Sequence, residues 1–97
     1  MSVSVKCVTA RRQGDMTEHS CYIYEGGDLV YVLTVRVYYH KTRVTAKIVA
    51  RSELEAEAWR RFEAELSRRL SEAAPKPVED RVVNEIIEEY LAELIAA

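Results

Sequence analysis

The chain has 97 residues, with 14 Lys or Arg against 16 Asp or Glu and a formal net charge of −2. That length fits one domain with a single core, and it is small enough for oligomerisation to add stability. We find no signal peptide, and no apolar run approaches the ~20 residues that a membrane helix needs, so we expect a soluble, cytoplasmic protein without membrane contact.

The charge is unevenly distributed along the chain. Residues 1–51 hold eight Lys or Arg against four Asp or Glu, whereas residues 52–97 hold six against twelve. A basic first half permits nucleic-acid binding without requiring it, because a basic domain overall is the stronger signal. One Asn and one Gln beside abundant Glu, Arg and Val is a composition typical of a thermophile protein.

The first residues predict two strands that pair with each other. Residues 2–10 alternate with Cys7 on the apolar face, and Gly14-Asp15 marks a turn before a second strand over residues 19–25. If the two strands pair about Gly14, Cys7 faces Cys21 directly. We favour two buried free thiols, and a Cys7–Cys21 disulfide is the alternative, because such bonds are rare inside cells except in hyperthermophiles.

Gly26-Gly27 predicts the next hairpin turn, and its length decides which residues face the core. A two-residue loop pairs Tyr24 with Leu29 and places Tyr22 and Tyr24 on the apolar face. We favour this loop, because two-residue Gly-Gly turns are common in hairpins. If Asp28 also belongs to the loop, Cys21 and Ile23 join the apolar face and the two tyrosines lie opposite.

The stretch from Asp28 to Arg51 predicts the two central strands, because it alternates and is rich in Val, Tyr and Thr. Taking His40-Lys41 as the loop pairs Val37 with Val44. A four-residue loop of the same parity is the alternative, since the turn has no Gly or Asn. Either loop puts one set of residues on the core face: Leu29, Tyr31, Leu33, Val35, Val37, Tyr39, Val44, Ala46, Ile48 and Ala50.

The opposite face of this central hairpin mixes valines with cations. We take five of its residues as nucleic-acid candidates, because aromatic rings stack on bases and cations hold phosphates: Arg36, Tyr38, Arg43, Lys47 and Arg51. Two alternatives remain open. The face is solvated, with long Arg stems covering the valines, or it meets the acidic helices of a second subunit.

Two helices follow the sheet. Ser52-Glu53-Leu54-Glu55 is a capping box that predicts a helix over about residues 53–73, with an apolar stripe of Leu54, Ala58, Trp59, Phe62, Leu66 and Leu70. Pro75 and Pro77 separate it from a second helix over about residues 77–96.

The second helix carries an unusually wide apolar face. Its apolar residues span about 220° of the circumference, more than the ~100° stripe of a surface helix. We therefore expect part of this face to contact a second subunit, through the interface candidates Val82, Ile86, Tyr90, Leu91, Leu94 and Ile95.

The sequence predicts no catalytic, cofactor or metal site. His19 and His40 lie at strand ends without a nucleophile or an orienting carboxylate, so we expect both to be exposed. Structural zinc needs four clustered Cys or His ligands, and only His19 lies near Cys21. Gly26-Gly27 joins two strands and is therefore no phosphate loop.

These patterns predict one α+β domain over residues 1–97: a four-stranded antiparallel β-meander within residues 2–51, with two α-helices packed on one face of the sheet. We expect a small non-enzymatic module that forms a homodimer or docks another protein. Single-stranded nucleic-acid binding through the basic sheet face is the alternative. We infer no cofactor and no small-molecule substrate.

Overall fold

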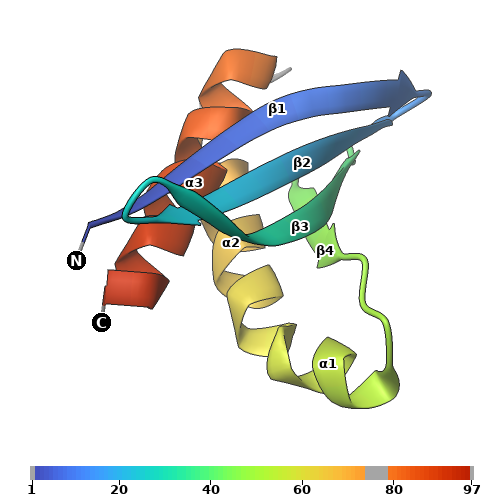
Figure 1. Ribbon diagram of the computed structural model, residues 1–97. Coiled ribbons are helices and arrows are strands. Elements are labelled where there is room, and N and C mark those ends of the chain that lie inside the picture. Colours follow the sequence, from blue (N-terminus) through green and yellow to red (C-terminus); the bar gives the residue numbers. More distant parts are fainter. Residues whose placement is uncertain (1, 74–78, 97) are drawn as a thin grey trace.

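The computed structural model describes residues 2–73 and 79–96 (Figure 1). Four antiparallel strands form one sheet in the order β1-β2-β3-β4, and helices follow it. The strands are β1 (Val3–Gln13), β2 (Met16–Glu25), β3 (Asp28–Tyr39) and β4 (Val44–Ile48), and the helices are α1 (Glu53–Ala58), α2 (Arg60–Glu72) and α3 (Asp80–Ala96). The α+β class and the meander are confirmed. Helix α3 packs along β1, and α2 packs along β4.

The first two strands pair as the turn at Gly14 predicts, with Cys7 opposite Cys21. The two cysteines form a disulfide, with their Cα atoms 4.1 Å apart. The preference for free thiols was therefore wrong. Beyond this point the register shifts between Thr9 and Arg11, which leaves Ala10 as an extra residue in β1.

The β2–β3 hairpin contains the main difference from the sequence prediction. Tyr24 pairs with Leu29 across Gly26-Gly27, whose φ angles are +58° and +89°. The two-residue loop is thus confirmed. Ile23, however, pairs with Tyr31, so Val30 is an extra residue in β3, a β-bulge that changes the pairing parity.

That bulge reverses which residues of β2 face the core. Cys21 and Ile23 are buried, at 0% and 6% exposed, whereas Tyr22 and Tyr24 lie on the opposite face. The expectation that the tyrosines join the apolar face was therefore wrong, although the turn that led to it is correct.

The β3–β4 connection is the longer of the two loops considered. Tyr39 pairs with Val44 and Val35 with Ile48, so residues 40–43 form the connection and the His40-Lys41 loop was wrong. The His40 N–H donates to the Arg43 carbonyl over 2.9 Å. Because the parity is unchanged, Leu33, Val35, Val37, Val44, Ala46 and Ile48 are buried as predicted, although β4 ends at Ile48 and not at Arg51. Leu29 was wrongly placed on the core face: it precedes the bulge, pairs with Tyr24 and is 52% exposed.

The core fills the space between the sheet and the two long helices. Helix α2 contributes Phe62, Leu66 and Leu70, and α3 contributes Val83, Ile87 and Leu91. The core comprises these residues together with Cys7, Cys21, Leu33, Val35, Val37, Val44, Ala46 and Ile48. Apolar alternation along the strands and helical spacing in α2 therefore both converge on one core.

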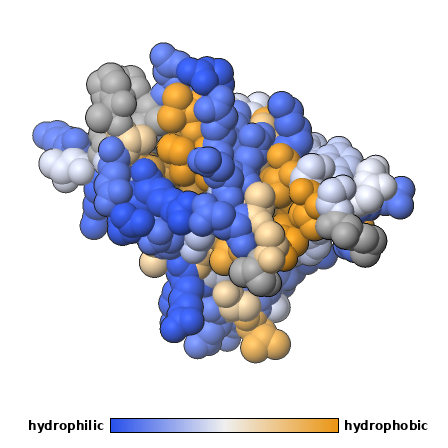
Figure 2. All heavy atoms as spheres, turned by 90° about the vertical axis from the view of Figure 1, so that its left-hand side faces the viewer, coloured by the Kyte–Doolittle hydropathy of each residue, from blue (hydrophilic) through white to orange (hydrophobic). Residues whose placement is uncertain are grey.

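Several interface candidates on α3 face inward. Leu91 is 1% exposed and is therefore a core residue, which corrects its assignment, and Val82, Ile86 and Tyr90 pack against the core. Leu94 and Ile95 remain exposed, at 42% and 41%. Figure 2, which faces the side where both chain ends lie in Figure 1, shows hydrophobic residues uncovered between strongly hydrophilic ones.

The helix predicted over residues 53–73 is interrupted at Trp59, which separates α1 from α2. The predicted cap is present, because the Glu55 N–H donates to Ser52 Oγ over 3.1 Å. Leu54 was expected in the buried stripe, but it is 82% exposed. Helix α3 begins at Asp80, and Pro75 and Pro77 lie outside the described residues.

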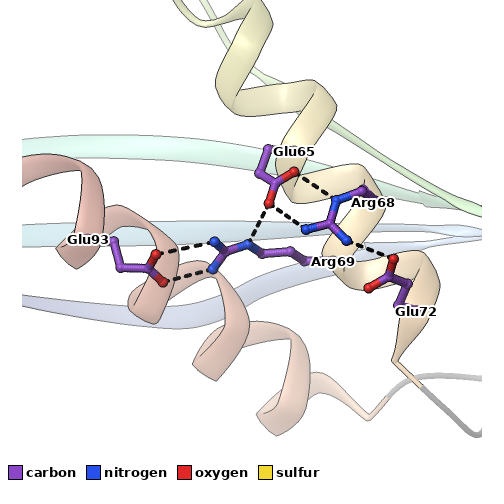
Figure 3. Close-up of polar contacts among 5 residues, drawn as sticks. All are labelled: Glu65, Arg68, Arg69, Glu72 and Glu93. Atoms are coloured by element: carbon purple, nitrogen blue, oxygen red, sulfur yellow. Dashed lines mark hydrogen bonds and ion pairs between the residues drawn. The ribbon is translucent and has the colours of Figure 1, made fainter.

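An ion-pair network joins α2 to α3 (Figure 3). Arg69 donates to Glu65 on its own helix and to both carboxylate oxygens of Glu93 on α3, over 2.8 and 3.2 Å. Arg68 donates to Glu65 and Glu72. Hydrogen bonds from Arg68 and Arg69 lower the pKa of Glu65 to about 2. The network therefore stays ionised at neutral pH and holds the two helices together.

Helix side chains also close the edges of the sheet. On β4, the N–H groups of Val44, Ala46 and Ile48 donate to Ser71 Oγ, Ser67 Oγ and Glu63 Oε2 over 2.8, 2.8 and 2.7 Å. On β1, the Cys7 N–H donates to Glu88 Oε2 over 2.7 Å. Unpaired edge groups are templates for added strands. These contacts therefore block strand addition along β4 and at the middle of β1.

Candidate functional site

The helices leave one face of the sheet uncovered, and we call it the open face. Its side chains come from all four strands and alternate with the core residues. It includes Lys6 and Val8 from β1, Glu18, Tyr22 and Tyr24 from β2, Leu29, Val32, Arg36 and Tyr38 from β3, and Lys47 from β4.

Aromatic rings lie at the two ends of the open face. Tyr22 stands between Lys6 and Val32, and Tyr24 follows two residues along β2, at a spacing of about 7 Å. Tyr38 lies at the other end, beside Met16. Tyr24 and Met16 are eight positions apart along β2, so the aromatic groups extend over about 27 Å.

Cations lie between these aromatic ends. Arg36 pairs across the sheet with Lys47 on one side and Glu18 on the other. Its Nε donates to Glu18 Oε2 over 2.9 Å, which raises the pKa of Arg36 and lowers the pKa of Glu18. Arg11 also approaches Glu18, at 3.5 Å. Glu18 thus partly neutralises this row, whereas Lys6 and Lys47 are exposed.

The structure brings together three of the five nucleic-acid candidates. Arg36, Tyr38 and Lys47 share the open face. Arg43 lies in the connection between β3 and β4, and Arg51 lies beyond the end of β4, so neither belongs to the paired part of the sheet.

Sequence reasoning missed Lys6 as a member of this face. Its signal was present, because pairing Cys7 with Cys21 also sets Lys6 opposite Tyr22. Tyr22 and Tyr24 were assigned here only under the loop that was not favoured, and the bulge at Val30 is what places them on this face.

A second polar cluster lies buried on the core side of the sheet. His19 is 0% exposed, so its assignment as an exposed edge residue was wrong. Its Nε2 contacts Thr17 Oγ1 at 2.8 Å, its Nδ1 contacts Asn84 Oδ1 at 2.7 Å, and Thr17 Oγ1 lies 3.0 Å from the Tyr39 hydroxyl. Burial lowers the pKa of His19. In the neutral ring Nδ1–H donates to Asn84, and Nε2 accepts from Thr17.

Within residues 2–73 and 79–96, no group of three or more His, Cys, Asp or Glu side chains is arranged to hold a metal ion. The helices in that part of the chain include none that is long and apolar enough to span a membrane. No family model, curated protein or solved structure matches the chain.

Proposed function

We propose that the open face binds single-stranded nucleic acid. The observation that carries the proposal is the placement of Tyr22, Tyr24 and Tyr38 on one helix-free face, with Lys6, Arg36 and Lys47 between and beside them. Tyrosine rings stack on unpaired bases of any sequence, and cations hold the phosphates that connect those bases.

The burial of α3 supports this choice over dimerisation through the second helix. Four of the six interface candidates on α3 contribute to the core or pack against it. The wide apolar face of that helix is therefore largely satisfied within the chain. The open face, in contrast, is left without cover by the described helices.

The charges predict a modest salt dependence. Lys6, Arg36 and Lys47 supply two to three phosphate contacts, because Glu18 already engages Arg36. With about 0.7 counterions released per contact on a single strand, the logarithm of the binding constant should fall with the logarithm of salt concentration at a slope of about −2.

The test is a fluorescence anisotropy titration of the full chain against a labelled oligothymidine at several salt concentrations. Tyr22→Leu keeps an apolar residue but removes the stacking ring, and should weaken binding by about 1–3 kcal/mol. Tyr31→Leu is the matched control, because Tyr31 lies on the core side of the same sheet. Glu18→Gln releases Arg36 and should tighten binding.

Two results would overturn the proposal. One is the absence of binding at low salt. The other is equal weakening in Tyr22→Leu and Tyr31→Leu, which would show that folding and not stacking was affected.

A different observation on the same face favours a second candidate function. In that function the chain is a small non-enzymatic module that docks another protein or its own copy. Val8 and Val32 are 41% and 42% exposed. Val49, whose N–H donates to the Thr34 backbone carbonyl, is 41% exposed. Nucleic acid does not require these aliphatic groups. If they form a dimer interface, light scattering will detect a salt-resistant dimer that Val32→Glu dissociates; a monomer at all concentrations would exclude a dimer on this face.

A further inference from the structure

Helix α1 buries none of its own residues in the described part of the chain. It has six residues, none of them buried, and Leu54 is 82% exposed. In Figure 1 it lies below the sheet, at the lower end of α2. The Trp59 N–H donates to the Glu55 carbonyl and the Glu63 N–H donates to the Trp59 carbonyl, so the backbone ties α1 to α2. What α1 leaves uncovered is the apolar side chain of Leu54.

Leu54 and Ala58 show which side of α1 is left uncovered. They are four residues apart, so they lie on the same side of the helix, and both are exposed. Sequence periodicity placed both in an apolar stripe, and the chain leaves that part of the stripe uncovered. An exposed leucine on a short projecting helix is a group suited to fill a cavity.

An apolar cavity of about 560 Å³ opens close to α1, lined by Ile23, Tyr31, Trp59, Leu91, Leu94 and Ile95. Leu91 is buried, whereas Leu94 and Ile95 are about two-fifths exposed. Trp59, which joins α1 to α2, forms another part of the wall and contacts Phe62 edge-on, with ring centres 5.3 Å apart. The exposed leucine and the cavity therefore occupy the same end of the molecule, since Leu54 and Trp59 are five positions apart, which corresponds to about 8 Å along a helix.

We propose that a second copy of this chain covers this end, with Leu54 of each copy filling the apolar cavity of the other. In a two-fold dimer, a residue that contacts a site on its partner is matched by the reverse contact. Leu54 and the cavity lie at the same end of the chain. A two-fold axis at that end therefore places each Leu54 opposite the cavity of the partner copy. A small apolar ligand would fill the cavity but would leave Leu54 in water.

Charge complementarity supports a second copy as the occupant. Helix α1 carries Glu53, Glu55 and Glu57, and α2 begins with Arg60 and Arg61, four of the five being exposed. A two-fold axis close to Trp59 brings the acidic helix of one copy towards the two arginines of the other. Opposite charges at the rim of an apolar contact fix its orientation and favour the correct partner.

The test is light scattering of the full chain over a concentration series. The expected result is a dimer of twice 11.1 kDa, with Leu54→Glu weakening dimerisation at least tenfold. Because Leu54 is 82% exposed in the described part of its own chain, this variant should keep the circular dichroism spectrum of the folded protein. Val32→Glu is the matched control, an exposed aliphatic residue on the open face, and should leave the dimer intact.

A second experiment tests the contact itself. Chains carrying Leu54→Cys are mixed with chains carrying Ile95→Cys under mild oxidation. Preferential formation of mixed disulfide dimers supports the arrangement. A monomeric wild-type chain, or a dimer that Leu54→Glu leaves unchanged, would overturn it. A dimer that Val32→Glu dissociates would place the interface on the open face and overturn it too. Oligothymidine binding is read at other residues, so it stands or falls independently.

Discussion

Replacing Ser67 with alanine measures how much the closed edge of β4 contributes to stability. The Ala46 N–H donates to Ser67 Oγ over 2.8 Å, and Ala46 is 1% exposed. Without the hydroxyl, this buried N–H has no acceptor, which costs about 1–3 kcal/mol. Alanine is the better helix former by about 0.5 kcal/mol, which offsets part of the loss. We therefore expect Ser67→Ala to lower the free energy of unfolding by about 0.5–2.5 kcal/mol.

The assay is urea denaturation followed by the fluorescence of Trp59, with thermal melts beside it. A loss of 1 kcal/mol corresponds to a fall in Tm of about 4–8 °C for a domain of this size. The matched control is Ala64→Ser, at an exposed position of the same helix. It reports the helix preference for alanine over serine without any contact to a strand.

The sign of the change in unfolding free energy in Ser67→Ala shows whether the hydrogen bond or the helix preference dominates. If only helix preference counts, Ser67→Ala will stabilise the protein by about as much as Ala64→Ser destabilises it. That outcome would refute the claim that α2 supplies hydrogen-bond acceptors to the edge strand.

Three further measurements address the core and the helix pair. Burial lowers the pKa of His19 from 6.5; between that lowered value and pH 6.5 the unfolded chain binds a proton that the folded chain does not. The free energy of unfolding should thus be highest above pH 6.5 and should decline as the pH falls through this window. In urea titrations at several pH values, His19→Gln should flatten that decline. A decline that is equally steep in His19→Gln would mean that other groups cause it. Reducing the Cys7–Cys21 disulfide, whose cysteines are 14 residues apart, should lower the free energy of unfolding by about 3 kcal/mol, and equal urea midpoints with and without reductant would contradict this. Glu93→Gln should cost less than about 1 kcal/mol, because the Glu93 side chain is 57% exposed, and the difference should disappear at about 1 M salt; a loss that persists there would point to packing instead of charge.

Local patterns were sufficient for most of the fold. The central strands alternate so regularly that either loop length gives the same core face, since both have the same parity. The spacing of Phe62, Leu66 and Leu70 in α2 likewise leads directly to buried positions. Where one periodicity dominates a segment, the residues that become buried can be predicted from the sequence.

The differences arise where contacts distant in sequence decide. Leu29 and Val30 are both apolar, so nothing in the alternation marks Val30 as the extra residue. His19 is buried because Asn84, 65 residues away, supplies a hydrogen-bond partner. The break at Trp59 is a local exception, because the helical periodicity of residues 53–73 continues through it.

The candidate site depended on the same distant contacts. Arg36, Tyr38 and Lys47 lie on the two strands whose faces were certain, and all three were identified. Tyr22 and Tyr24 lie beyond the bulge, and Lys6 lies one strand further, so their positions required each preceding register to be known. Uncertainty in register therefore increases from the centre of the sheet towards β1.

The bulge at Val30 determines the chemistry of the open face by leaving one residue of β3 out of the pairing. With Val30 unpaired, the disulfide lies inside and the tyrosines lie outside. If Val30 were instead paired with Ile23, Tyr22 would face Tyr31 on the core side and the two sets would be exchanged. Removing Val30 would leave Tyr24 opposite Leu29 and Ile23 opposite Tyr31 in regular pairing, with both sets in place. The hairpin should consequently accept many side chains at position 30, and even the loss of that residue.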